Sequence, residues 1–189
     1  MKAIHPLSLG VLLGAAALSA AGQSLPPLPS GFQADPNLAQ VQAPMRAAGT
    51  GDGTSGKKSN DNMSPCFSDP KVSLGYGWML NPAAKTMVEM LLKAPEDPAV
   101  RSPAGYLDEP DGKRDYQGGV LEWRKQTWPV ISGHPCKDSQ VVFYQAKWTG
   151  YAGNKMISIG IYNLYNSKGQ GQTWIDGYIG KLTAALGSK

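Results

Sequence analysis

Four carboxylates stand close enough together in the stretch 106–116 to take part in one reaction. They are Asp108, Glu109, Asp111 and Asp115, and Tyr106 and Tyr116 flank them. A pair of carboxylates on the two sides of a glycosidic bond supplies the acid and the base of glycan hydrolysis. An aromatic ring beside such a pair can stack on the sugar. The stretch therefore offers one candidate active site, that of a carboxylate-dependent hydrolase with a glycan-type substrate.

The same carboxylates allow two other interpretations. Carboxylate oxygens are ligands for Ca²⁺. A calcium-binding loop of the EF-hand type that started at Asp108 would need a bidentate Glu where Gly119 stands. The simpler interpretation is a solvated loop in which Lys113 and Arg114 balance the charge locally. We adopt this interpretation, and we expect neither a metal ion nor a cofactor.

Other residue types offer few candidates for a catalytic or metal site. Once a signal peptide over 1–22 is removed, His134 is the single histidine, which excludes metal sites built on several histidines. The chain has no Gly-x-Ser-x-Gly motif, which is typical of α/β-hydrolases. Cys66 and Cys136 are the two cysteines, and we expect them to form a disulfide in an oxidising compartment. The alternative is a nucleophilic Cys136 with His134 as its base.

The amino terminus predicts export. Lys2 is followed by an uncharged run over 7–18 and by small residues over 19–22. This pattern is typical of a secretory signal peptide over 1–22, with cleavage after Ala21 or Gly22. A run of about a dozen apolar residues is short for a membrane span, and no later segment reaches the required length of about 18. We expect a secreted or periplasmic protein without a transmembrane segment in the mature chain.

The distribution of charge argues against a nucleic-acid partner. The chain carries 18 Lys and Arg against 14 Asp and Glu, a net charge of +4. The basic residues are scattered, whereas proteins that bind nucleic acid concentrate them in a patch. We therefore expect no nucleic-acid partner.

The chain divides after the signal into two regions. Residues 23–65 are poor in large apolar side chains and rich in Gly, Ser and Pro, which predicts a flexible leader. One short helix can begin at Asp35-Pro36, with Leu38, Val41 and Met45 on one face, but Pro44 interrupts it. Residues 66–189 hold 15 of the 16 aromatic residues and are predicted to form a single folded domain.

The periodicity of the domain predicts four strands and two helices. Strands are expected over 72–80, 119–128, 140–148 and 155–165, and helices from Asn81-Pro82 to Pro95 and over 174–186. Residues 94–118 are expected to be a long loop. The order β-α-loop-β-β-β-α predicts an α+β two-layer sandwich, an antiparallel sheet with both helices on one face.

Such a sheet would expose its other face as a binding surface. Strand alternation places seven residues there: Arg124, Gln126, Phe143, Gln145, Lys147, Ser158 and Tyr162. Tyr106 and Tyr116 of the loop would add to it. Tyr, Trp and Arg are enriched at interfaces. We interpret the chain as a non-catalytic binding or accessory protein, an inhibitor or envelope factor, that acts on a protein or cell-envelope partner through this face and the 94–118 loop. The hydrolase remains the alternative, and a self-associating structural component of the envelope is a third.

Overall fold

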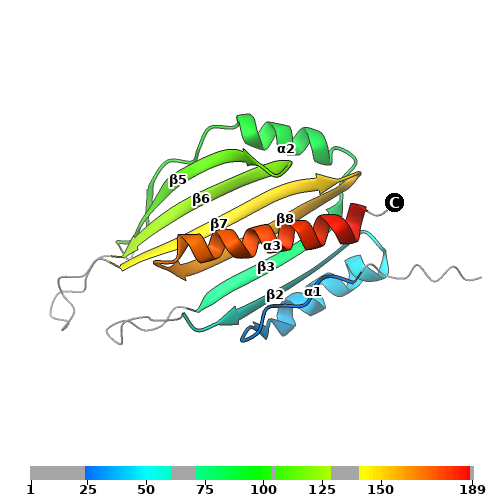
Figure 1. Ribbon diagram of the computed structural model, residues 1–189, viewed down its shortest axis with the longest axis horizontal. Coiled ribbons are helices and arrows are strands. Elements are labelled where there is room, and N and C mark those ends of the chain that lie inside the picture. The colour runs from blue at the N-terminus through cyan, green and yellow to red at the C-terminus, as the bar shows by residue number, and fades with distance from the viewer. Residues whose placement is uncertain (1–23, 61–70, 104, 129–140, 188–189) are drawn as a thin grey trace, which may run out of the picture.

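The computed structural model describes residues 24–60, 71–103, 105–128 and 141–187. The helices are α1 (Pro36–Ala47), α2 (Ala84–Lys93) and α3 (Lys168–Gly187). The strands are β1 (Gln33–Ala34), β2 (Gly51–Lys58), β3 (Val72–Leu80), β4 (Val100–Arg101), β5 (Leu107–Tyr116), β6 (Gly119–Trp128), β7 (Val141–Ala152) and β8 (Lys155–Tyr165). They form one antiparallel sheet in the order β1-β2-β3-β8-β7-β6-β5-β4 (Figure 1). The predicted α+β class with an antiparallel sheet is confirmed.

The main core lies between the sheet and α3. Alternating side chains of the central strands, such as Leu74, Trp148 and Ile159, pack against Ile175 and Leu182 of α3. These side chains are almost completely removed from water. Burial of this kind is the main source of stability of the fold.

The segment before β1 runs beside α3 on the same face. The Tyr76 hydroxyl donates to the Pro26 carbonyl at 2.6 Å, and the Tyr178 hydroxyl donates to the Pro27 carbonyl at 2.7 Å. The Phe32 ring meets the edge of Trp174, with centroids 5.5 Å apart. The segment is therefore tied to the core by two hydrogen bonds and one aromatic contact.

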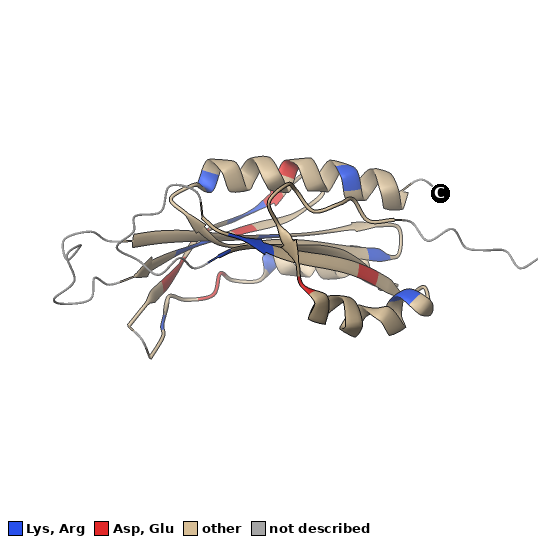
Figure 2. Cartoon of the chain, turned by 90° about the horizontal axis from the view of Figure 1, so that it is seen from below, with Lys and Arg blue, Asp and Glu red and all other residues tan. Residues whose placement is uncertain are grey.

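The helices lie on both faces of the sheet. Neighbouring residues of β5 show this, because side chains alternate along a strand. Lys113 donates to the carbonyl of Leu91 in α2 at 3.2 Å, whereas Arg114 donates to Gln172 of α3 at 3.4 Å. Figure 2 shows α3 on one side of the sheet and the other two helices on the opposite side. The arrangement with both predicted helices on one face is thus replaced by three layers.

The first part of β7 carries buried apolar side chains on both faces. The alternation of β7 is regular, and the register shift opposite Tyr144 and Ala146 places an extra residue in β8, between Ile161 and Leu164. Ala146 and Trp148 face α3, while Val141 and Phe143 are buried outside that core. A sheet with apolar residues on both faces needs cover on both.

The segment expected to be a flexible leader carries β1, α1 and β2. β2 pairs with β3 along its whole length, from Gly51 opposite Met79 to Lys58 opposite Val72. The strand has almost no apolar side chains, so its ladder of backbone hydrogen bonds replaces the missing hydrophobic contribution. Glycines permit the close approach, since a Cβ at Gly77 would lie 2.5 Å from the Asp52 carbonyl oxygen.

The expected 94–118 loop contains β4 and β5. β5 is charged because it lies near an edge of the sheet, where Lys, Asp and Glu are common. Its proline is accommodated by a register shift between Pro110 and Gly112. Proline and charge thus mark a peripheral strand here, which the sequence pattern did not distinguish from a loop.

Several predictions fall outside the described residues. They are the signal peptide over 1–22, the Cys66–Cys136 disulfide and the alternative role of His134. In the part of the chain that is described, no helix is long and apolar enough to cross a membrane.

Candidate binding groove

A groove crosses the face of the sheet opposite α3. Its floor consists of Gly75 and Gly77 of β3 and Ser158 and Gly160 of β8. Apolar residues of α1 form one wall: Leu38, Val41 and Met45. The remaining lining residues are Gln42, Asp52, Thr54, Tyr76, Trp78, Met79, Met156 and Tyr162, and the volume of the groove is about 400 Å³. We call this the open groove.

The floor is flat because it lacks side chains. Three of its four residues are glycines, which expose the backbone of two central strands. The Tyr162 ring lies over Gly160, since a Cβ at Gly160 would be 2.8 Å from ring atoms of Tyr162. Tyr162 is 44% exposed and forms the boundary of the groove at this end.

Methionines surround the open groove. Met45, Met79 and Met156 line it. Asn81 links α2 to this wall, with its Nδ2 at 2.8 Å from Met87 Sδ and 4.0 Å from Met156 Sδ. Met90 lies one helical turn beyond Met87 and is 65% exposed. Three of the five methionines of the described residues therefore line the groove, and Asn81 connects a fourth, Met87, to it.

Beyond Tyr162 the groove becomes charged. Its lining residues here are Asp97, Asp108, Glu122, Arg124, Gln145, Ala146 and Lys147, together with Tyr162 itself. Arg124 forms ion pairs with Asp97 at 3.0 Å and with Asp108 at 3.8 Å. Gln145 donates to Asp108 Oδ2 at 2.9 Å. The other oxygen, Oδ1, is buried and accepts no hydrogen bond from the described residues. We call this region, of about 330 Å³, the polar end.

Of the seven residues predicted for an open sheet face, the structure brings four together at the polar end and places Ser158 on the floor of the open groove. Arg124, Gln145, Lys147 and Tyr162 all line the polar end. Gln126 lies further along β6, where its Oε1 accepts a hydrogen bond from Trp128 Nε1 at 3.0 Å.

Phe143 does not belong to this surface. Its side chain is 1% exposed and packs between the rings of Trp128, at 4.7 Å, and Tyr165, at 5.8 Å. The prediction placed it on the correct face but overlooked the cover on that face. Phe143 is therefore a core residue.

The two loop tyrosines are separated from each other. Tyr106 stacks on Trp128 with centroids 4.4 Å apart. Tyr116 points to the α3 side, where its hydroxyl donates to Asp176 at 2.7 Å. Tyr116 thus belongs to the contact between β5 and α3 and lies away from the groove.

The four clustered carboxylates are also dispersed, because they stand on a strand. Asp108 points to the polar end. Glu109 points to the other face and pairs with Lys125 at 2.7 Å, an interaction that raises the pKa of Lys125. Asp111 pairs with Lys168 of α3, and Asp115 is exposed. Asp108 and Glu109 therefore face opposite sides of the sheet, whereas Glu109 and Asp111 both lie on the α3 side, each paired with a lysine.

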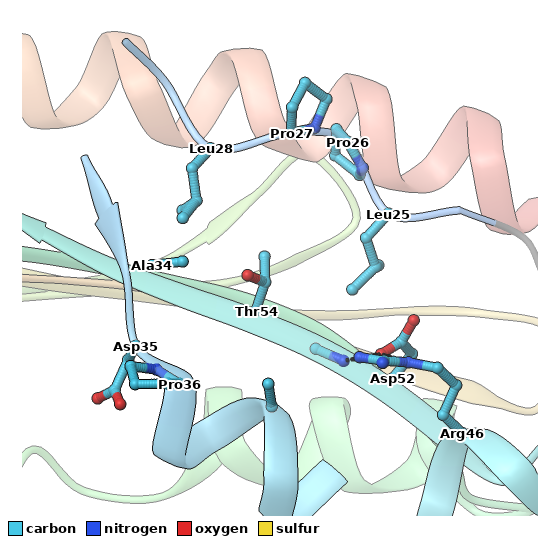
Figure 3. A pocket seen from close by; sticks show the side chains of 12 residues that line it. Leu25, Pro26, Pro27, Leu28, Ala34, Asp35, Pro36, Arg46, Asp52 and Thr54 are labelled. Atoms are coloured by element: carbon cyan, nitrogen blue, oxygen red, sulfur yellow. Dashed lines mark hydrogen bonds and ion pairs between the residues drawn. The ribbon is translucent and has the colours of Figure 1, made fainter. Parts of the chain in front are cut away.

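A second pocket lies at the β2 edge of the sheet, between the amino-terminal segment and α1 (Figure 3). It has a volume of about 380 Å³, and Leu25, Leu28 and two prolines line one side. At its end Arg46 Nε donates to Asp52 Oδ1 at 2.8 Å, and the Gly53 amide donates to the same oxygen at 2.8 Å. Because these polar groups satisfy one another, we regard the open groove as the stronger candidate.

No protein-family model, curated protein or solved structure matches the chain. Across the described ranges, no three His, Cys, Asp or Glu side chains are grouped to hold a metal ion.

The sequence analysis missed the apolar half of the groove. Two signals pointed toward it: the stripe of Leu38, Val41 and Met45, and the paired Gly75 and Gly77 on one face of a strand. What was missing was the location of α1, which lies over β2 and so forms a wall of the groove.

Proposed function

We propose that this chain is a secreted or periplasmic, non-catalytic binding or accessory protein that acts through the open groove and its polar end. The observation that carries the proposal is the apolar surface left in water at one place. Val41 is 70% exposed, Tyr162 44% and Met79 43%, and all three line the open groove. Clustered apolar surface of this kind is typical of interaction sites.

The polar end supports recognition of a partner rather than catalysis. Two of its carboxylates, Asp97 and Asp108, are paired with Arg124. Asp97 comes from the 94–118 segment and is largely exposed, so this segment contributes to the same surface. Paired charges at the rim of an apolar site give orientation and specificity. A protein or cell-envelope partner fits such a surface.

Site-specific photocrosslinking tests the proposal. A photoreactive amino acid replaces Ser158 on the groove floor, and in a control it replaces Thr173, which is exposed on α3. Both proteins are expressed from the full-length sequence, including residues 1–22, in the source cells, and the cells are irradiated. We expect a discrete adduct from position 158 and none from position 173. Absence of an adduct at 158, or the same adducts at both positions, contradicts the proposal.

A further inference from the structure

We propose that the open groove binds one amphipathic α-helix of a partner protein, with its apolar face on β3 and β8 and a basic residue over the polar end. The inference rests on the proposed function and names the partner's chemistry. Three observations carry it: the pairing of the floor strands, the spacing of α1 and α2, and the charge beyond Tyr162.

The floor strands favour a helix over an extended peptide. β3 is paired on both sides, by β2 and β8, and β8 is paired on both sides, by β3 and β7. An extended peptide laid on this face would find no free strand edge for its backbone groups, which must be satisfied when they leave water. A helix satisfies its own backbone and presents only side chains.

The layer opposite α3 has room for one more helix. α1 packs over β2, and α2 packs mainly over β7 and β6. Three to four strand spacings of about 4.8 Å separate these positions, or about 14–19 Å. Adjacent helices pack about 8–10 Å apart, so one intervening helix needs about 16–20 Å. β3 and the part of β8 that lines the open groove lie in this interval.

The methionines suit the apolar face of a helix. Met45, Met79 and Met156 are unbranched and adjust to side chains of different shape. Glycines in the floor allow the helix to approach the sheet closely. Anchors spaced at i, i+3, i+4 and i+7 would follow the groove.

The charge at the polar end orients the helix. Three carboxylates, Asp97, Asp108 and Glu122, face two cations, Arg124 and Lys147. Arg124 already serves two of the carboxylates. The local excess is negative although the whole chain has a net charge of +4. A preference for a basic helix end would therefore be a property of this site and not of the whole molecule.

The test uses designed peptides of about 16 residues, long enough to follow the groove as a helix. One peptide has leucines at helical spacing and two lysines at one end. A second replaces the lysines with glutamates, and a third carries a central proline that breaks the helix. Binding is measured by fluorescence anisotropy and by NMR of ¹³C-methyl methionine, with the signals of Met45, Met79 and Met156 assigned through Met→Leu variants. Laurate is titrated in parallel as a probe for lipid binding.

We expect the first peptide to shift the signals of the three groove methionines and to bind at least about 10-fold more tightly than either variant peptide. Ser158→Arg should abolish binding because it fills the groove, whereas Thr173→Arg on α3 should not change it. If the proline peptide binds as tightly as the first peptide, the partner segment is not bound as a helix. If the glutamate peptide binds as tightly, the polar end does not select a basic helix end. If laurate shifts these signals and the helix does not, the inference fails while the proposed function stands. If position 158 also gives no crosslinked adduct, both fail.

Discussion

Phe143 and Tyr162 show how two aromatic residues on neighbouring strands differ in role. Phe143 is 1% exposed and Tyr162 is 44% exposed. Truncation of a buried Phe removes its transfer free energy and leaves a cavity. We expect Phe143→Ala to lower the free energy of unfolding by about 3–5 kcal/mol, and Tyr162→Ala to lower it by less than about 1 kcal/mol. Urea denaturation of both variants measures this, and similar losses for the two would contradict the burial of Phe143.

The pair Tyr76 and Tyr178 predicts a loss of stability at alkaline pH. Their ring centroids are 4.3 Å apart, and burial raises the pKa of both hydroxyls. The folded protein therefore keeps these protons at a pH where the unfolded chain, with a tyrosine pKa of about 10, loses them. Stability from this source is complete below pH 10 and falls as the pH rises above it.

Urea denaturation at several pH values between about 8 and 11 tests this expectation. The double variant Tyr76→Phe, Tyr178→Phe should show a weaker decline above pH 10. It should also lose about 1 kcal/mol for each hydrogen bond to the Pro26 and Pro27 carbonyls at every pH. An unchanged slope in the double variant would mean that other groups cause the decline.

At the level of elements, hydrophobic periodicity predicted what it can detect. The strands corresponding to β3, β6, β7 and β8 and the helices corresponding to α2 and α3 were all expected. Helix starts were less certain. The helix expected from Asn81-Pro82 begins at Ala84 with Ala83 as its N-cap, and Asn81 Oδ1 accepts a hydrogen bond from the Ala83 amide at 2.9 Å. α3 begins at Lys168, six residues before the predicted start at Trp174.

β2 was missed because nothing in its own side chains predicts a strand. Its stability depends on the glycines of its partner, β3, which permit close backbone approach. A Cβ at Gly77 would meet backbone atoms of β2 at 2.5 and 2.8 Å, whereas one at Gly75 would meet the Ser55 side chain at 3.3 Å. Sequence patterns within a strand do not encode such a relation between two strands.

The same glycines give a prediction for the element. We expect Gly77→Ala to destabilise the protein by about 1–3 kcal/mol through overpacking, and Gly75→Ala to cost less. Hydrogen exchange should show faster exchange of the β2 amides in Gly77→Ala, with the β6 and β7 amides less affected. Equal effects of the two variants would contradict the close β2–β3 approach.

At the scale of the whole molecule, the candidate site combines segments that are distant in the sequence. Alternation correctly placed Arg124, Gln145, Lys147 and Tyr162 on one face, because that property is local to each strand. The apolar wall comes from α1, and nothing local predicts which face of the sheet α1 covers. The polar half of the groove was therefore predictable, and the apolar half required the fold.

The incorporation of residues 24–60 into the sheet can be tested on the native protein. Trypsin cuts after Arg46, Lys57 and Lys58 in a flexible leader, and these sites would then be the first to be cleaved. In the structure Arg46 belongs to α1 and is paired with Asp52, and Lys57 lies opposite Gln33 within the sheet. Cleavage needs an extended, accessible backbone, so it must wait for local or global opening.

We therefore expect the native protein to remain uncut at these three positions while the heat-unfolded protein is cut rapidly. Mass spectrometry of a trypsin time course identifies the sites. The Gly77→Ala variant provides a graded control, because separating β2 from β3 should accelerate cleavage after Lys57 and Lys58 in proportion to the loss of β2 protection. Immediate cleavage after Arg46 and Lys57 in the native wild-type protein would mean that α1 and β2 are not part of the folded domain. The open groove would then lack the apolar wall that α1 provides.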